Sequence, residues 1–234
     1  MNNLIKIKLL LKKNTNSSNT EGSKFFKTGP GQYAAHDVFM NIPVPILRKI
    51  AKEYQDLSLP EIKILLDSKF NEERLLALII LVNQYKKSDF ETQTKLFKFY
   101  LKNIKQINNW NLVDSSAHLI LGAYWYEHKL DQVLLLKLAK SSLLWERRIA
   151  IVSTWYFIKK NDLKWTFNLA KILMQDKEDL MHKAVGWMLR EAGKQDQALL
   201  LKFLDKYHQK MPRTMFRYAI EKLSENQKKR YKGL

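Results

Sequence analysis

The sequence has 234 residues, of which 46% are hydrophobic and 12% aromatic, and this is enough apolar material for a folded core. Its formal net charge of +18 favours a polyanion as partner, either nucleic acid or an acidic membrane surface. Because cysteine is absent, disulfides, thiolate metal sites and a cysteine nucleophile are excluded together.

The first residues, MNNLIKIKLLLKKN, are predicted to form an amphipathic helix. Lysines interrupt their apolar stretch and no small-residue cleavage site follows, which argues against a signal peptide. No segment reaches the roughly 20 apolar residues that a membrane-spanning helix requires. We therefore expect a cytoplasmic protein without a membrane partner.

A polar segment, NTNSSNTEGS at 14–23, follows this helix and is typical of a linker. We expect residues 1–22 to form an N-terminal helix and linker, and residues 23–234 to form a single domain. The segment 27–45 holds three of the five prolines, so it is predicted to be a loop before the helices begin.

The rest of the sequence is predicted to be helical, because apolar residues recur at intervals of three and four. Long helices are expected to begin near Glu72, Trp110, Trp145, Leu180 and Pro212, which are 38, 35, 35 and 32 residues apart by subtraction. Shorter helices are expected between them, near 90–105, 130–141, 163–174 and 195–209. This period predicts an all-α fold, a curved α-solenoid of antiparallel helix pairs.

Two residues at the start of one long helix suggest chemistry. Trp110 and Asp114 are four residues apart, so a helix projects them from one face. Arg148 follows Asp114 by 34 residues and Trp187 follows Arg148 by 39, which is close to the repeat period. Neighbouring repeats are therefore predicted to present all four to one concave surface.

A carboxylate on such a surface suits a reaction that develops positive charge, such as cleavage of an N-glycosidic bond through an oxocarbenium-like sugar. Asp114 would stabilise that cation and orient water. The indole rings would attract a cation with about 0.5 to 2 kcal/mol each. From the residues alone a second interpretation stays open, in which the tryptophans fill the core and the aspartate caps a helix.

Five stretches resemble the AlkD-type DNA glycosylases, alkylation repair enzymes built from HEAT-like helical repeats. They follow one another in the family's order between residues 25 and 223. The stretches are FFKTGPGQYAAHDVFMNIPVPILRKIA at 25–51, INNWNLVDSSA at 107–117, SSLLWERRIAIVSTWYFIKK at 141–160, HKAVGWMLREAGK at 182–194 and PRTMFRYAIEKL at 212–223.

This resemblance implies a monofunctional glycosylase of base excision repair, which hydrolyses the glycosidic bond of positively charged alkylpurines such as 3-methyladenine and 7-methylguanine. It implies double-stranded DNA with alkylated bases as partner, no metal or organic cofactor, and no need to flip the lesion into a pocket. We expect the protein to act as a monomer. Carried over onto the matching motifs, the catalytic set is Trp110, Asp114, Arg148 and Trp187.

Five basic residues are candidate phosphate contacts, although each also fits an ordinary solvated surface: Lys27, Arg48, Arg190, Arg213 and Arg217. The chain departs from the family at two places. It has GQYAAHD at 31–37 where a G-E-Y-G-E-G-D stretch is frequent, and Asn111 where aspartate is frequent. No role is assigned to that loop from the sequence.

Other site classes lack support, because the sequence has no HExxH motif, no P-loop and no GxGxxG. Two alternatives to a glycosylase stay open. One is a non-catalytic helical-repeat scaffold that binds nucleic acid or protein. The other is an RNA-binding solenoid that uses the same basic surface with stacking aromatics.

Overall fold

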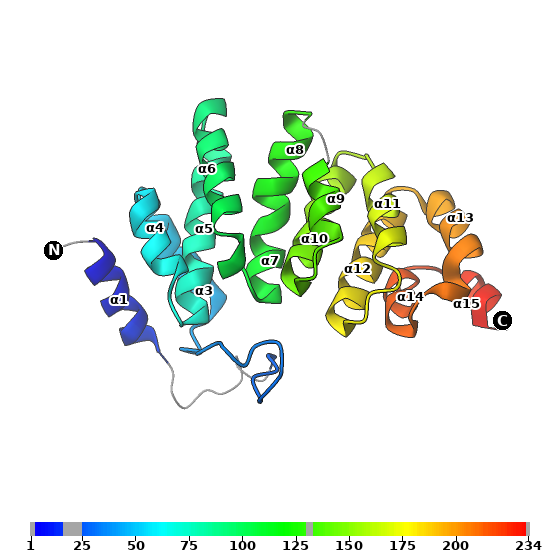
Figure 1. The fold of residues 1–234 in the computed structure, drawn as a ribbon, viewed down its shortest axis with the longest axis horizontal. Coiled ribbons are helices and arrows are strands. Elements are labelled where there is room, and N and C mark those ends of the chain that lie inside the picture. Colours follow the sequence, from blue (N-terminus) through cyan, green and yellow to red (C-terminus); the bar gives the residue numbers. More distant parts are fainter. Residues whose placement is uncertain (1–2, 16–24, 130–132, 233–234) are drawn as a thin grey trace. The chain divides into compact units, whose positions relative to one another are not determined.

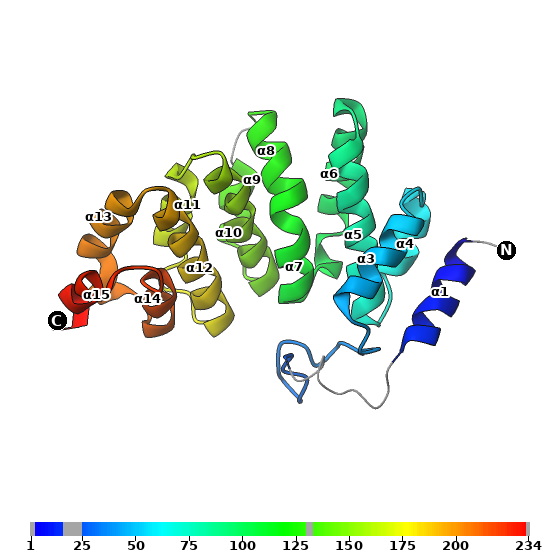
Figure 2. The ribbon, with the colours of Figure 1, turned by 180° about the vertical axis from the view of Figure 1, so that it is seen from behind.

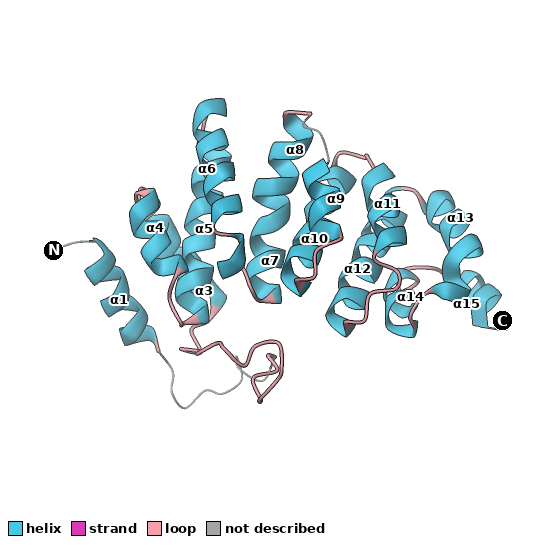
Figure 3. Cartoon of the chain, in the orientation of Figure 1, coloured by secondary structure: helices cyan, strands magenta, loops and turns pink. Residues whose placement is uncertain are grey.

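The computed structural model describes residues 3–15, 25–129 and 133–232. Within them all regular secondary structure is helical, which confirms the predicted all-α class (Figure 3). Helices that are both long and apolar enough to cross a bilayer do not occur in these ranges. The chain divides into two compact units, residues 1–116 and 117–234. The boundary expected near residue 22 stays a prediction, because 16–24 lie outside the described residues.

The first unit is organised around one long helix, α5 (Asn71–Lys87), which is buried along almost its whole first half. Helices α3, α4 and α6 pack on it, as Figure 1 shows. The elements of this unit are α1 (Asn3–Asn14), α3 (Val44–Glu53), α4 (Leu59–Leu66), α5, α6 (Phe90–Lys102), a 3-10 turn (Ile104–Gln106) and the start of α7 (Trp110–Ala117).

Local sequence explains where these helices begin. The predicted N-terminal helix is confirmed as α1, and it buries Leu4, Ile7 and Leu11 at helical spacing. At the start of α4, Ser58 and Glu61 form a reciprocal capping box. Asp89 accepts a hydrogen bond from the Thr92 N–H at 2.9 Å and so caps α6.

The second unit is a series of packed helices in which α10 (Leu144–Lys159) and α12 (Asp179–Gln195) are the longest. Helix α10 packs against α9, α11 and α12, while α12 packs against α13 and α14. The remaining elements are a π-helical turn (His118–Gly122), α8 (Ala123–Glu127), α9 (Val133–Ala139), α11 (Lys164–Ile172), α13 (Gln197–Tyr207), a 3-10 turn (His208–Lys210), α14 (Arg213–Ala219) and α15 (Glu225–Lys232).

The long helices begin within one residue of their predicted starts, at Asn71, Trp110, Leu144, Asp179 and Arg213. The shorter helices α6, α9, α11 and α13 alternate with them, as the helix-pair period of an α-solenoid requires. The π-helical turn that follows α7 was not anticipated, because the apolar period runs through it without a break.

Two glycines allow close packing in the second unit. A Cβ at Gly186 of α12 would lie 2.5 Å from the Met215 carbonyl oxygen and 2.5 Å from the Tyr218 Cβ, both on α14. A Cβ at Gly122 would lie 2.2 Å from the Ser153 carbonyl oxygen of α10. Figures 1 and 2 both show α12 and α14 side by side. Only glycine fits these distances, since real Cβ atoms do not approach other atoms so closely.

Candidate functional site

Trp110 is the first residue of α7, and its indole is held by a loop of the first unit. The ring stacks on Phe26 with centroids 4.9 Å apart and an interplanar angle of 16°. Phe26 in turn packs against Phe39 at 4.5 Å. The Trp110 N–H donates to the Asn109 side-chain oxygen at 2.7 Å. Both the position of the helix start and the orientation of the ring are therefore fixed.

Asp114 lies one turn further along α7, where it is half-buried. The structure thus places Trp110 and Asp114 on one helix at the predicted spacing. Burial raises the pKa of Tyr100, and the negative charge of Asp114 raises it further. The Tyr100 hydroxyl lies 2.9 Å from the Ser116 hydroxyl. Asp114 and Tyr100 are therefore close enough for the charge of the carboxylate to affect the phenol.

A cleft of about 400 Å³ adjoins Trp110 in the first unit. Its aromatic walls come from Phe25, Phe26, Phe39 and Trp110. Among the described residues that line it, the charged side chain is Glu72. The recess beside Trp110 is therefore acidic and aromatic, although the chain as a whole carries a large positive charge.

Glu72 is buried at the start of α5 and holds the loop that forms the cleft. Its carboxylate oxygens accept hydrogen bonds from the Met40 N–H at 3.0 Å and the Asn41 N–H at 2.8 Å. Asn41 has a φ of 57°, a left-handed conformation that asparagine tolerates better than most residues. Burial raises the pKa of Glu72 above its ordinary value of 4.5, although the backbone N–H groups pull it down.

The raised pKa of Glu72 predicts a measurable dependence of stability on pH. Because the folded chain binds this proton more tightly than the unfolded chain does, the free energy of unfolding should fall as pH rises from 4.5 through the folded pKa. Glu72→Gln should remove this slope in urea titrations measured at a series of pH values. Glu61→Gln is the control. The Ser58 hydrogen bonds lower the pKa of Glu61, so its titration changes stability only below pH 4.5, and the slope above pH 4.5 should stay as in the wild type. An unchanged slope in Glu72→Gln would contradict this assignment.

A polar network behind Trp110 was not anticipated from the sequence, and Asp37 is its centre. The Asp37 side chain is fully buried. Its carboxylate accepts hydrogen bonds from Arg74, from the Asn71 Nδ2 at 3.1 Å and from Asn109. Because Asn109 also accepts the Trp110 N–H, the network joins the loop, α5 and the start of α7. The sequence signal for it is the run of asparagines in INNWN, which supplies Asn109 and Asn111.

The amide of Asn111 extends this network along α7. Its Nδ2 donates to the Asn71 Oδ1 at 2.7 Å, and both residues line the cleft beside Trp110. The departure from aspartate at this position therefore has a local reason. An asparagine pairs with Asn71 by donating a hydrogen bond, whereas an ionised carboxylate can only accept one.

Arg148 lies on α10 in the second unit, and it is buried. Its Nη1 donates to the Leu180 carbonyl oxygen at 2.6 Å, in the first turn of α12. The neighbouring Arg147 pairs with Asp176 through two contacts, at 2.6 and 3.1 Å. Both arginines thus fix the entry into α12. The proposed catalytic role of Arg148 stays a prediction, and the structure adds a positioning role.

Trp187 lies on α12, where its ring meets Trp155 of α10 at 5.0 Å and 64°. Trp155 also packs against His118 at 4.4 Å, and the Lys159 ammonium lies 4.4 Å above the Trp155 ring. The Arg148 contact and the Trp187 contact are seven residues apart on both helices, which is about 10 Å along the helix axes. The structure therefore gives Trp187 a neighbouring indole, Trp155, that the sequence did not single out.

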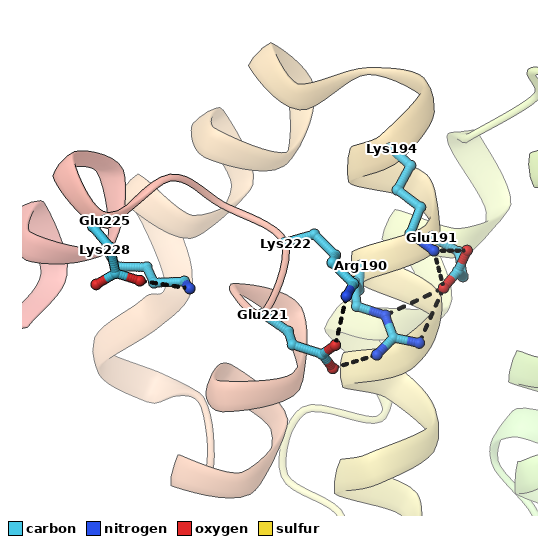
Figure 4. A network of polar contacts seen from close by, with 7 residues as sticks. All are labelled: Arg190, Glu191, Lys194, Glu221, Lys222, Glu225 and Lys228. Atoms are coloured by element: carbon cyan, nitrogen blue, oxygen red, sulfur yellow. Dashed lines mark hydrogen bonds and ion pairs between the residues drawn. The ribbon is translucent and has the colours of Figure 1, made fainter.

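The candidate phosphate contacts differ in their surroundings. Lys27, Arg48, Arg213 and Arg217 are exposed, and they form no ion pair within the described ranges. Arg190 instead lies between two carboxylates, as Figure 4 shows. It contacts Glu221 through Nη1 and Glu191 at 3.1 and 3.2 Å. A phosphate at Arg190 would have to compete with both acids, so the other four are the more accessible cations.

The family described as "DNA alkylation repair enzyme" matches residues 7–223. No curated protein sequence matches the chain. A solved structure, a predicted DNA alkylation repair enzyme from Enterococcus faecalis, is similar in fold, with 16% identity and a TM-score of 0.64. That similarity covers 86% of this chain and 98% of the other. Because the family match spans nearly the whole sequence, the chain belongs to the DNA alkylation repair enzyme family.

Proposed function

We propose that the protein is an AlkD-type monofunctional DNA glycosylase, which hydrolyses the N-glycosidic bond of positively charged alkylpurines such as 3-methyladenine and 7-methylguanine in duplex DNA. Membership of the alkylation repair family supports a role in DNA repair. The observation that carries the proposal is that Asp114 and Trp110 lie one turn apart on the same helix, α7. The stack of Trp110 on Phe26 holds the indole in place.

The chemistry follows from the charge of the substrate. When the glycosidic bond breaks, its electron pair passes to the cationic base and neutralises it, so the base leaves without prior protonation. Positive charge then develops on the deoxyribose. The oxygen of a water molecule forms the new bond to C1′, and one proton is released to solvent. Asp114 is proposed to stabilise the developing cation and to orient that water.

The magnitude of this stabilisation is sufficient to matter. A full unit charge about 4 Å from a carboxylate gains roughly 4 kcal/mol at an effective dielectric constant of about 20. Each 1.36 kcal/mol or so of transition-state stabilisation is tenfold in rate, so this interaction corresponds to about three orders of magnitude. In a chain of net charge +18, the average field opposes a developing cation. A local carboxylate would offset this field.

The remaining residues are proposed to hold DNA. Trp110 would pack against the deoxyribose, and Trp187 would do the same on the second unit, where Trp155 supports its ring. Arg148, which the resemblance places in the catalytic set, is proposed to organise the site by fixing the start of α12, the helix that carries Trp187, through its bond to Leu180. The four accessible cations, Lys27, Arg48, Arg213 and Arg217, would add affinity that depends on salt concentration but not on sequence.

Release of the free base tests this proposal directly. A duplex that contains 7-methylguanine is incubated with the protein, and the free base is quantified by chromatography. We expect free 7-methylguanine and an abasic strand in equal amounts. Binding to the duplex without any release would contradict the proposal and would identify a non-catalytic scaffold. Tighter binding to duplex RNA than to duplex DNA, again without release, would identify an RNA-binding protein.

A further inference from the structure

We propose that helices α11 and α13 carry a second nucleic-acid site, which binds an unpaired nucleotide of a single strand. A cleft of about 270 Å³ lies between these helices. Lysines of both helices line it: Lys164 and Lys171 from α11, and Lys202 and Lys206 from α13. None of these residues belongs to the proposed glycosylase site, so the two functions are separable.

In the described part of the chain, the lysines of this cleft are not paired with carboxylates, although the Lys206 ammonium lies 5.5 Å from the centre of the Tyr207 ring. Within the described ranges, the four lysines form no ion pair, and no acidic side chain lines the cleft. The nearest acid on α13 is Asp205, and its carboxylate is bound by Arg230 at 2.8 Å and by the Tyr231 hydroxyl at 2.9 Å. Four cations around one recess repel each other, so an anion bound there would relieve the repulsion.

Elsewhere in the same unit, lysines are commonly paired within their own helix. Lys194 contacts Glu191 at 2.8 Å and Lys228 contacts Glu225 at 3.0 Å. Helix α13 carries no such pair, although Lys202 and Asp205 are three residues apart, which is a spacing that permits one. The Asp205 carboxylate instead contacts Arg230 and Tyr231 of α15. The lysines at the cleft thus differ from other lysines of this unit in having no carboxylate partner among the described residues, and the basic composition of the chain does not by itself explain this difference.

The floor of the cleft is aromatic, and this distinguishes the expected ligand from a simple anion. Phe167 and Phe203 have ring centroids 5.2 Å apart, and Phe203 and Tyr207 are 4.8 Å apart. Phe167 and Phe203 are only 7% and 6% exposed, whereas Tyr207 is half-buried and Leu199 is 37% exposed, so Tyr207 is the ring on which a base would stack. A free phosphate gains nothing from such a floor, whereas a nucleobase stacks on aromatic rings with about 1–3 kcal/mol per base. Lysines at the rim would then hold the adjoining phosphates.

The ligand must be unpaired, because the faces of paired bases are covered by their neighbours in the stack. Only a single strand, a loop or a frayed end presents a base face to a shallow cleft. The volume of the cleft is close to the lower limit of about 300 Å³ for small-molecule sites, which suits one nucleotide. The geometry therefore favours a strand that crosses the cleft and places one base on its floor.

Binding of a labelled oligothymidine of six nucleotides to the full chain, measured by fluorescence anisotropy, tests this site. Saturating unlabelled duplex is present so that the proposed duplex-binding surface is occupied. The double variant Lys202→Ala, Lys206→Ala is expected to weaken binding at least tenfold. It should also flatten the plot of log affinity against log salt by about 1.4, since each lost phosphate contact contributes about 0.7.

Two further variants make the test specific. Lys98→Ala, Lys102→Ala on α6 removes two exposed lysines with the same spacing that also form no ion pair, and it should change the affinity less than twofold. Tyr207→Ala should weaken binding several-fold without changing the salt dependence, because it removes stacking and not charge. Equal losses in the two lysine pairs would overturn the site.

Tyr207→Ala also distinguishes a nucleotide from other anionic ligands. An undiminished affinity in Tyr207→Ala, together with equal binding of inorganic polyphosphate, would overturn a nucleotide site in favour of a plain anion patch. Preferential binding to anionic lipid vesicles would overturn it in favour of a membrane surface. None of these measurements depends on base release. They therefore test the second site independently of the glycosylase proposal.

Discussion

Replacing Asp114 by asparagine is expected to lower the single-turnover rate of 7-methylguanine release by two to three orders of magnitude, with duplex binding unchanged. The substitution removes a charge and keeps the shape of the side chain. Loss of a single preorganised electrostatic contact at a developing charge typically costs about 10²–10³ in rate. Because asparagine has nearly the same size as aspartate and Asp114 is only half-buried, the folded structure should persist.

The matched control for this experiment is Asp67→Asn. Asp67 is an exposed carboxylate of the first unit that pairs with Lys63 one turn away, and it lies outside the cleft beside Trp110. Its replacement should leave both the rate of release and duplex affinity unchanged. If Asp114→Asn folds normally and releases the base at the wild-type rate, Asp114 does not stabilise the transition state and the proposed mechanism is wrong.

The second large effect is expected from Asp37→Asn, which should destabilise the first unit by about 3–5 kcal/mol. Asp37 and Arg74 are a buried ion pair, and removing one charge leaves the other desolvated without a partner. Urea unfolding followed by amide hydrogen exchange in α5 reports on this unit specifically. Asp67→Asn again serves as the control, because exposed pairs contribute only about 0–1 kcal/mol.

The same substitution should also reduce base release, for a structural reason. Asn109 donates to Asp37 and accepts the Trp110 N–H, so a loosened network frees the start of α7. A rate that falls in parallel with hydrogen-exchange protection at Trp110 would support this coupling. If Asp37→Asn unfolds at the wild-type urea concentration, the buried pair does not stabilise the unit, and Trp110 is held by its ring contacts alone.

The parts of the structure that depend on short-range periodicity could be predicted from the sequence. The starts of α5, α7, α10, α12 and α14 were predicted to within one residue, because each follows a break in a three-to-four apolar pattern. The shared face of Trp110 and Asp114 follows from the same geometry. Within α7, sequence spacing alone therefore places two of the proposed site residues.

Contacts between distant residues could not be predicted in this way. Asp37 meets Arg74 and Asn109, which are 37 and 72 residues further along the chain. No periodic pattern links such positions. Arg148 shows the related difficulty, because an arginine is normally expected at the surface, yet this one is buried against the Leu180 carbonyl. Long-range polar pairing thus determines the surroundings of the site without leaving a local signature.

Glycine at position 186 limits the substitutions that this protein can tolerate. Any other residue there would push α14 away from α12, because its Cβ would overlap the Met215 carbonyl oxygen. Helix α14 carries Arg213 and Arg217, two of the accessible cations. The placement of those charges therefore depends on a position that bears no charge and no side chain. Mutations at Gly186 would alter the basic surface without replacing a single basic residue.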